Sequence, residues 1–462
     1  MTSPLRLVNE TSDLHYVERS AWCNRVPPVF PVENYSMWYN VLDELYGGMD
    51  IIQLPDKGFM LLVQSGLIRT DANGNFLWYR EHEHDFTASS FVRCANGDYA
   101  IIGSKVVYNL EDSNGSAVVL RTTAEGTPLW NTTFDSPYID WGTSIVECGN
   151  GDFLVTITSE KYYEWSQGTS GGGQGLERYA VHLLRLTNEG TPLWNSTYGE
   201  GYRHYFSKII ACNDGSFAIV GGRNITNPFD IILPDNDIRD DIWVLRVDSG
   251  GTILGNYIYD IGDYDRSVSI VESQAGGFAI TGHSNHEYFL LRVSDEGAHL
   301  WHEVYPLWQQ YPYDLVECQS GGYAIIGRFR SYGVELPPNL VSLKCCNEYD
   351  IRLVRTNETG TLQWDFIFGA YEPDYARAIV ECSDGGFVIT GDTFIDGTYP
   401  EDGGTWLVYI PDEVPPEYLR NWPPKSSPPP PNLALITLIV IVTASSMIAV
   451  SFGIYRWRRG MR

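Results

Sequence analysis

The hydrophobic pattern of this chain consists of short apolar runs separated by turn residues. Runs such as SIVEC, GFAIT and IWVLRV are four to eight residues long, and Gly, Asp, Asn and Ser interrupt them at turn spacing. No segment before residue 430 has the apolar period of a helix. The pattern therefore predicts many short β-strands joined by tight turns.

The same order of elements recurs seven times. An aromatic residue follows the first turn of each unit, at Phe59, Tyr99, Phe153, Phe217, Phe278, Tyr323 and Phe387. An arginine follows at Arg69, Arg121, Arg185, Arg246, Arg292 and Arg355, with Tyr409 in the last unit. Each unit predicts four strands, which we name A (as in IVEC), B (GFAIT), C (WVLRV) and D (TPLWN). Such units are too small to bury their own faces, so their repetition predicts a β-propeller.

The seventh unit ends after strand C, and its strand D is predicted at the other end of the chain. Trp38 lies 16 residues before Leu54, as Trp78 lies 16 residues before Cys94 at the end of the next strand A. A strand supplied by the N-terminus would close the ring and remove its open edges. We therefore expect an all-β, seven-bladed propeller over residues 36–410, closed by an N-terminal strand.

The length of the unit varies in one place only. The spacing from the arginine of strand C to the end of the next strand A is 25 to 27 residues, whereas the spacing from the aromatic residue to that arginine runs from 10 to 32. The variation thus lies in the B–C loops. In a propeller these loops and the D–A connections emerge on one face, here named the insertion face, and the A–B and C–D turns emerge on the other, the short-turn face. Variable loops on a rigid scaffold favour ligand binding at the insertion face.

Polar and aromatic residues are predicted near the ring axis at this face, five residues before each strand A: Tyr46, Phe86, Asp140, His204, Asp265, Gln310 and Asp374. Around them we expect Tyr138, Trp141, Tyr202, Tyr205, Trp308, Tyr311 and Tyr375, with Tyr162, Tyr163 and Trp165 on the third B–C loop. Aromatic rings with polar tips are typical of sugar platforms and protein interfaces. The residues predict a glycan or peptide site, and the alternative is that they fill gaps between blades. The tryptophans of strand D are predicted to be core residues.

Composition and charge exclude other classes. The 462 residues are 43% hydrophobic, which excludes a disordered chain, and the net charge of −27 argues against a nucleic-acid partner because phosphate contacts need clustered Lys and Arg. The strand-C arginines and the strand-A glutamates Glu147, Glu272, Glu317 and Glu381 approach the short-turn face, where we expect ion pairs between blades.

Five of the eight cysteines occupy the end of strand A in different blades: Cys94, Cys148, Cys212, Cys318 and Cys382. Equivalent positions around a ring lie too far apart for disulfides, so buried free thiols are expected. Cys23 could pair with Cys345 or Cys346, and the sequence leaves this open.

The C-terminus predicts a membrane anchor. Leu433–Ile454 is an uncharged stretch of 22 residues, long enough as a helix to cross a bilayer. Four arginines follow it, and the positive-inside rule places them in the cytoplasm. The predicted organisation is an N-terminal extension (1–35), the propeller (36–410), a Pro-rich stalk (411–431), a transmembrane helix (432–455) and a basic cytoplasmic tail (456–462).

The side of the membrane on which the propeller lies is a separate prediction. Residues 1–36 contain no signal peptide, so we expect that the signal is missing from this sequence. The alternative is a tail-anchored protein with a cytoplasmic propeller. Seven glycosylation sequons favour export, at Asn9, Asn34, Asn114, Asn131, Asn195, Asn224 and Asn357.

Two groups of residues are candidate metal ligands. Asp235, Asp237, Asp240 and Asp241 in the fourth B–C loop place several carboxylates together, as Ca²⁺ requires, and a solvated acidic loop is the alternative. His82 and His84 alternate along a strand and could hold Zn²⁺, although no third ligand is specified. Apart from calcium, no cofactor is expected.

The GGFAI and LW elements and the single C-terminal anchor resemble the repeat of archaeal and bacterial cell-surface propellers, which look like quinoprotein-like (PQQ-like) propellers. The resemblance implies the architecture and leaves the activity open. A quinone-dependent enzyme is one alternative, on the adjacency of Cys345 and Cys346. A glycoside-acting enzyme is another, with Asp140 and Asp265 as a carboxylate pair. Because no catalytic motif is present, we expect a non-catalytic recognition or adhesion module that binds a glycan or protein.

Overall fold

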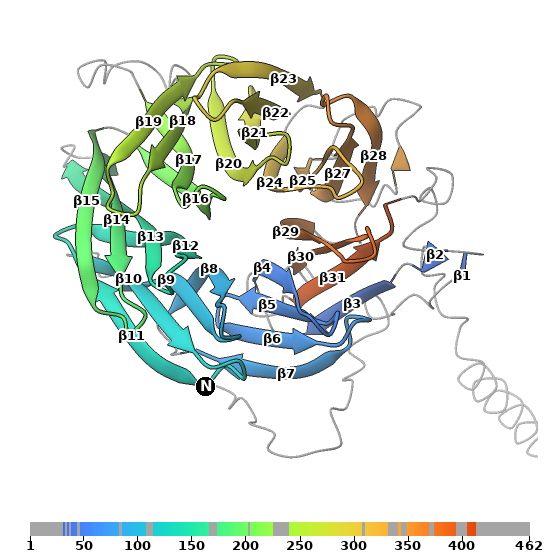
Figure 1. Cartoon of the computed structure of the whole chain (residues 1–462), viewed down its shortest axis with the longest axis horizontal. Helices are drawn as coiled ribbons and strands as arrows, with labels where there is room; N and C mark the ends of the chain where they lie inside the picture. The colour runs from blue at the N-terminus through green and yellow to red at the C-terminus, as the bar shows by residue number, and fades with distance from the viewer. Residues whose placement is uncertain are drawn as a thin grey trace, which may run out of the picture. The chain divides into compact units, whose positions relative to one another are not determined.

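The computed structural model of the chain is an all-β structure of antiparallel sheets (Figure 1). It describes residues 31–32, 35–36, 38–43, 47–82, 86–107, 114–165, 173–201, 204–224, 240–306, 310–330, 341–342, 349–368, 374–393 and 404–412. These residues belong to one compact unit, Pro27–Pro423. Within the described ranges no helix is long and apolar enough to cross a membrane. The predicted stalk, transmembrane helix and tail lie outside the described residues.

The strands form groups of four that are consecutive in sequence. The first three groups are β4 (Gly48–Gln53), β5 (Phe59–Val63), β6 (Gly66–Thr70) and β7 (Phe76–Glu81); β8 (Thr87–Arg93), β9 (Tyr99–Val107), β10 (Asn114–Thr122) and β11 (Pro128–Phe134); and β12 (Ile139–Glu147), β13 (Phe153–Trp165), β14 (Gly173–Leu186) and β15 (Pro192–Gly201). The second and third groups belong to one eight-stranded sheet, because Gly115 of β10 also pairs with Ile139 of β12 in parallel.

The remaining groups follow the same order. They are β16 (Tyr205–Ala211), β17 (Phe217–Asn224), β18 (Asp240–Val247) and β19 (Ile253–Tyr259); β20 (Asp265–Glu272), β21 (Phe278–Ser284), β22 (Glu287–Val293) and β23 (His299–Tyr305); β24 (Gln310–Glu317), β25 (Tyr323–Phe329), β27 (Asp350–Thr356) and β28 (Leu362–Phe368), with β26 (Val341–Ser342) beside β28; and β29 (Asp374–Glu381), β30 (Phe387–Thr393) and β31 (Gly404–Ile410). A separate hairpin consists of β1 (Pro31–Val32) and β2 (Tyr35–Ser36).

The last group takes its fourth strand from the N-terminal part of the chain. β3 (Trp38–Asp43) pairs antiparallel with β31, in a register that runs from Trp38 opposite Tyr409 to Asp43 opposite Gly404. This pairing confirms the prediction that the strand containing Trp38 completes the last unit. The first strand of each group lies toward the centre of the ring and the fourth toward its outside (Figure 1).

The core lies between neighbouring groups. In the described part of the chain, buried hydrophobic side chains form seven clusters, and each cluster joins residues of two successive groups. One of them joins the first group to the last, for example Ile51 and Phe59 with Val388 and Leu407. The strand-D tryptophans are half-buried at the edges of these clusters, so they are core residues only in part. Since each apolar face is covered by the next group, the ring is held together by its interfaces.

The ion pairs of the strand-C arginines near the short-turn face differ from those predicted. Arg121, Arg185 and Arg246 pair with Asp98, Asp152 and Asp214 in the A–B turn of their own group, at 3.3, 3.1 and 2.8 Å. These ion pairs do not bridge blades, because the arginine of strand C lies nearest to the turn that its own strand B leaves. The expected Arg–Glu pairs between blades do not form at these three arginines, but Arg355 of the sixth group pairs with Asp412, which follows β31 of the last group, at 2.7 Å.

The strand-A glutamates nevertheless link the groups by hydrogen bonds. The carboxylates of Glu147, Glu272, Glu317 and Glu381 accept backbone N–H groups of Ala95, Asn213, Gln274 and Gln319, each in the preceding group, at 2.8 to 2.9 Å. Gln53 of the first group accepts the N–H of Ser383 in the last group at 2.9 Å. The five cysteines of the same region are buried and free, which confirms the expectation of unpaired thiols.

Candidate functional site

Most of the predicted channel-mouth residues are buried, and two of them, Asp140 and Asp265, hold the D–A connections. Asp140 is fully buried, and its carboxylate accepts hydrogen bonds from the N–H and hydroxyl of Ser136, at 2.6 and 2.8 Å, and from the hydroxyl of Ser159. Asp265 is also fully buried and accepts the N–H groups of Ile261 and Gly262, at 2.6 and 3.1 Å. Burial raises the pKa of both carboxyls. These bonds assign both residues a structural role in anchoring the loop that precedes strand A.

The other members of the predicted ring have similar surroundings. Gln310 is fully buried and accepts a hydrogen bond from Arg352, while Phe86, His204 and Asp374 are also buried. Burial, followed by the charge of Arg223, lowers the pKa of His204 to about 4, so this imidazole is neutral at pH 7. Ligand binding by this ring stays a prediction. Tyr46 lies outside the described residues, as do Tyr202 and Trp308.

The residues one position later in the chain are less buried. This slot holds Gly47, Thr87, Trp141, Tyr205, Arg266, Tyr311 and Tyr375, of which Thr87 and Arg266 are exposed and the four aromatic residues half-buried. The indole of Trp141 donates a 3.1 Å hydrogen bond to Glu160. Tyr162 and Trp165 belong to β13, and their side chains lie outside the described part.

A glycine at the end of strand B brings this slot close to its neighbours. Gly103, Gly221, Gly282, Gly327 and Gly391 share the position, and a Cβ at each would collide with the carbonyl oxygen of the slot residue on strand A. At Gly327 the obstacles would also include the Tyr288 hydroxyl and the Cα of Pro312. The glycine therefore lets the backbone carrying Tyr205, Tyr311 or Tyr375 approach strand B. This glycine was visible in the sequence and predicts which inner-strand position lies nearest to the B–C loop.

Seven side chains form a continuous aromatic–arginine patch at the insertion face of the fifth to seventh groups: Tyr264, His283, His286, Tyr311, Arg328, Tyr349 and Tyr375. Tyr311 is the second residue of strand β24 and lies opposite Arg328 of β25, the strand that leads to the B–C loop. The ring of His283 meets Tyr311 edge-on at a centroid distance of 5.0 Å and stacks on Tyr264 at 5.5 Å. The B–C connection here is a tight turn with positive φ at Asn285 and His286, which leaves the His286 side chain exposed.

The guanidinium of Arg328 lies among three tyrosines of this patch. Its central carbon is 4.4 Å from the ring centroid of Tyr311, 5.1 Å from that of Tyr349 and 5.5 Å from that of Tyr375. The patch also contains one permanent cation, the guanidinium of Arg328. Burial, together with the charges of Arg266, His286 and Arg328, lowers the pKa of His283 to about 3. The sequence interpretation named Tyr311 and Tyr375 but missed Arg328, the histidines, Tyr264 and Tyr349.

A second polar group lies near the centre of the ring, where three inner strands meet. The Lys208 ammonium on β16 donates to Asp314 on β24 at 2.7 Å and to the Ser269 hydroxyl on β20 at 3.1 Å. Asp314 also accepts the Ser269 hydroxyl at 2.8 Å and the N–H of Ile379 at 3.2 Å. A β-bulge directly precedes Lys208, Ser269 and Asp314 in their strands, and another precedes Asp50 on β4. The bulge turns equivalent positions of several strands toward one another.

Protonation of this central cluster follows from burial and charge. Burial raises the pKa of Asp50 to about 6, and the repulsion of Asp314 adds to the effect while the attraction of Lys208 opposes it. Burial disfavours the charged ammonium of Lys208, but its ion pair and hydrogen bond with Asp314 and the charge of Asp50 outweigh this and raise its pKa. The cluster thus holds one cation, Lys208, together with the carboxyl groups of Asp50 and Asp314.

The substitution Asp50→Asn should raise the stability of the protein at pH 7.5 but not at pH 4.5. The pKa of the Asp50 carboxyl is about 6 in the folded protein, above its ordinary value of 3.8, so its stabilising contribution is present at low pH and is lost as the pH rises through 6. Removing the charge should restore about 1–3 kcal/mol at pH 7.5. Thermal unfolding of both proteins at the two pH values measures this.

The substitution Asp71→Asn is a control with the opposite expected effect on stability at pH 7.5. Asp71 accepts the N–H groups of Asn73 and Asn75 in a turn at 2.8 and 2.9 Å, and these bonds and the Asn75 amide hold its pKa below the usual value although burial opposes this. Asp71→Asn should therefore lower the melting temperature at pH 7.5. An equal effect of Asp50→Asn at both pH values would contradict the assignment.

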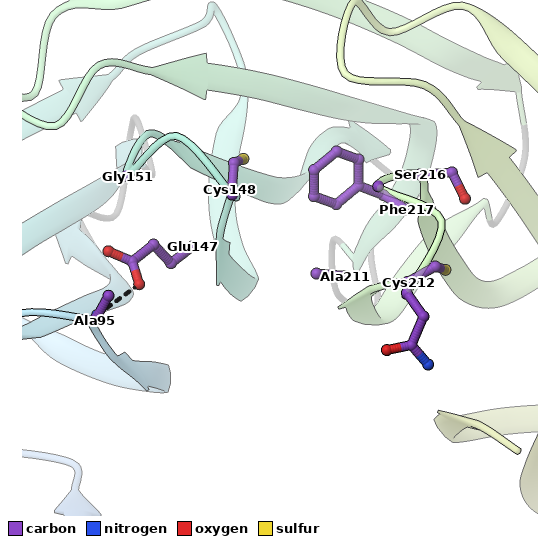
Figure 2. A pocket seen from close by; sticks show the side chains of 11 residues that line it. Ala95, Glu147, Cys148, Gly151, Ala211, Cys212, Ser216 and Phe217 are labelled. Carbon is purple, nitrogen blue, oxygen red and sulfur yellow. Dashed lines mark hydrogen bonds between the residues drawn. The ribbon is translucent and has the colours of Figure 1, made fainter. Parts of the chain in front are cut away.

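A cavity of about 450 Å³ opens at the short-turn face, opposite the predicted ligand face (Figure 2). It lies between A–B turns of the second, third and fourth groups, and Ala95, Glu147, Cys148, Cys212 and Phe217 are among its lining residues. The Glu147 carboxylate accepts a hydrogen bond from the N–H of Ala95. Burial raises the pKa of both thiols to about 11, so they are protonated and poor nucleophiles. The cavity thus has no activated nucleophile among these groups.

The predicted metal and glycosylation residues lie as follows. No cluster of three metal-binding side chains occurs among the residues that the structure describes. Asp240 and Asp241 are buried on β18, while Asp235, Asp237 and His84 lie outside the described ranges, so the calcium site stays a prediction. Asn131 and Asn195 are exposed on the outer strands β11 and β15, and the amide oxygen of Asn357 accepts turn N–H groups. Asn9, Asn34, Cys23, Cys345 and Cys346 are outside the described residues.

Comparisons with known proteins find only distant structural likenesses. No family model and no curated protein matches the chain. Among solved structures, β-propeller-like proteins match it. They include a streptogramin B lyase (14% identity, 80% of this chain and 98% of that chain, TM-score 0.49) and a catalytically inactive virginiamycin B lyase from Staphylococcus aureus with quinupristin (12%, 81% and 100%, 0.48). A Synechocystis apocarotenoid oxygenase mutant matches at 11% identity over 71% of this chain and 73% of that chain, with a TM-score of 0.44. Likenesses this distant carry no argument about activity, and the fold assignment rests on the observed strand pairing.

Proposed function

We propose that this protein is a membrane-anchored, extracellular recognition module in which a seven-bladed propeller binds a glycan or a protein at its insertion face. The aromatic–arginine patch is the observation on which the proposal rests. It combines aromatic faces, hydrogen-bonding tips and positive charge beside variable loops, a combination typical of binding surfaces.

The blade count is part of this proposal. The eight-stranded sheet counts as two blades, because its two halves share only the parallel pair Gly115–Ile139 and each half has the order of the other groups. The seven hydrophobic clusters support the same count, since a closed ring has as many interfaces as blades. The β3–β31 pairing supports closure within the seventh blade.

The anchor and the orientation rest on the sequence. The apolar stretch Leu433–Ile454, the arginines after it and the Pro-rich residues 411–431 support a propeller that a stalk holds outside the membrane. The exposure of the sequon residues Asn131 and Asn195 is compatible with glycosylation after export.

The glycoside-acting alternative has less support. Its predicted pair, Asp140 and Asp265, consists of fully buried carboxylates that accept hydrogen bonds from their own D–A connections. A catalytic acid or base must reach the substrate, and these bonds favour a structural role instead. For the quinone-dependent alternative, the adjacent cysteines lie outside the described residues.

Intact cells that display the full chain should bind members of a panel of cell-wall glycans and surface proteins. External protease should remove both the propeller and the binding. Tyr311→Ala and Tyr375→Ala should each weaken binding about 3- to 10-fold, as expected for aromatic contacts. Leu129→Ala is the control, because Leu129 is an exposed residue on the outer strand β11.

Three outcomes would contradict the proposal. Turnover of a glycoside or alcohol by the purified protein would indicate an enzyme, and full protection from external protease would place the propeller inside the cell. Binding that both tyrosine variants retain in full, with unchanged melting temperature, would remove the site from this patch.

A further inference from the structure

Four of the arginines that stack on aromatic rings in the described part of the chain also have a carboxylate partner. Arg352 lies 5.0 Å from the Tyr288 ring and bonds Asp365 at 2.5 to 3.2 Å. Arg377 lies 5.2 Å from the Tyr313 ring and pairs with Asp392 at 3.1 Å. Arg121 and Arg246 stack on phenylalanines and pair with aspartates of their own groups. In these cases the ring covers the face of the guanidinium, and an anion occupies its edge.

Arg328 differs from them in one respect. Three tyrosine rings surround its half-buried guanidinium, but no described carboxylate pairs with it. Its Nε atom is buried without a hydrogen-bond partner among the described residues. A buried donor without a partner is destabilising, and such groups in native structures need an explanation. A ligand that supplies the missing anion is one.

The surroundings of Arg328 favour a planar carboxylate on a sugar. The guanidinium fork matches a carboxylate in a two-bond geometry, which a neutral hydroxyl cannot reproduce. Tyr311, Tyr349 and Tyr375 offer ring faces and hydroxyl tips for the sugar around that carboxylate. The net charge of −27 repels polyanions in general, so an anionic ligand must be selected by a local positive site.

We propose that the aromatic–arginine patch binds an acidic glycan, with Arg328 gripping the carboxylate of a uronic acid residue and the three tyrosines packing on its ring. This rests on the proposed recognition function and names its ligand class. Arg328 is the specificity-determining residue, and the tyrosines provide contact area that neutral sugars share. The site therefore discriminates by charge.

The test uses the full chain in detergent and three soluble polymers. Polygalacturonate carries the carboxylate, its fully methyl-esterified form has the same ring without the charge, and polyglutamate has the charge without the sugar. The wild-type protein should bind polygalacturonate at least about 10-fold more tightly than either of the others. Arg328→Gln should abolish this preference, and Arg328→Lys should retain part of it because the charge remains but the fork is lost.

Arg80→Gln is the matched control. Arg80 also stacks on an aromatic ring, 5.7 Å from the centroid of Trp78, but it is exposed on the outer strand β7. Its variant should bind polygalacturonate like the wild type, and the melting temperatures of all variants verify folding.

The outcomes separate this inference from the proposed function. Equal binding of the acid and its methyl ester, or an unchanged preference in Arg328→Gln, overturns the acidic-glycan site while recognition by the patch stands. Equal binding of polyglutamate overturns the sugar assignment. Failure to bind polygalacturonate also overturns the inference, whereas failure to bind every glycan and protein of the panel overturns the proposed function as well.

Discussion

Deletion of residues 1–43 should destabilise the propeller strongly, whereas deletion of residues 1–37 should not. The two chains differ only in β3, whose six residues pair with β31 from Trp38–Tyr409 to Asp43–Gly404. Without β3, one edge of the last sheet is open and the cluster that Leu42 packs against loses a side chain. We expect a loss of about 3–6 kcal/mol, or a fall of roughly 5–10 °C in melting temperature, and aggregation through the unpaired edge.

Thermal unfolding followed by circular dichroism measures the first effect and light scattering the second. If the shorter chain does not fold alone, coexpression of residues 1–43 as a separate chain should restore a soluble protein, because the strand pairs without a covalent connection. Equal melting temperatures of the two truncated proteins would contradict closure by β3, and so would a coexpressed segment that fails to associate.

Lys208→Met should produce the second large effect. The substitution removes the cation between Asp50 and Asp314, whose side chains would remain in the centre of the ring without it. Breaking a buried ion pair from one side costs about 3–5 kcal/mol. Because the Lys208 side chain is 33% exposed and that of Asp314 11%, we expect about 2–4 kcal/mol at pH 7.5.

The loss should shrink at low pH and in a compensated variant. At pH 4.5 Asp50 is protonated, so the uncompensated charge is smaller. The variant with Lys208→Met, Asp50→Asn and Asp314→Asn leaves no charge in the cluster and should recover more than half of the loss at pH 7.5. A destabilisation that is independent of pH, or no recovery in the triple variant, would show that the methionine acts by packing alone.

The strands and their connection order were predictable because their signals are local. Alternating apolar runs and turn glycines recur at fixed spacing, the strand containing Trp38 has the same spacing as the other strands D, and the structure places these elements in the expected groups. The buried cysteines also followed from their equivalent positions.

The partners of polar side chains were not predictable in the same way. Arg121 pairs with Asp98 in its own group, and Glu147 accepts an N–H of the preceding group. These partners depend on distances of a few ångströms between turns, which the sequence does not show. The described residues of the candidate ring are buried, whereas most of those one position later are exposed or half-buried. Asp140 and Asp265 are buried and bond to the D–A connections, while Tyr311 and Tyr375 in the next position form the patch. A one-residue shift along a strand reverses the side that its side chain faces.

Arg328 was missed because its contacts come from segments that are far apart in the sequence. Nothing in its own strand distinguishes it from other strand-B residues. The three tyrosines that surround it, Tyr311, Tyr349 and Tyr375, belong to other segments. The glycine before it was the available signal, since Gly327 marks where strand B comes closest to the preceding strand A.

The pairing of β3 with β31 also sets the order of events during synthesis. β3 leaves the ribosome before β4, the first strand of the first group. Its partner β31 is the last of the described strands to leave it. At about 5–20 residues per second, β3 waits roughly 20–70 s for that partner. Throughout this time the first group has no neighbour on one side. Closure can therefore begin only after β31 has left the ribosome, and until then the nascent chain must be kept from pairing with a second copy.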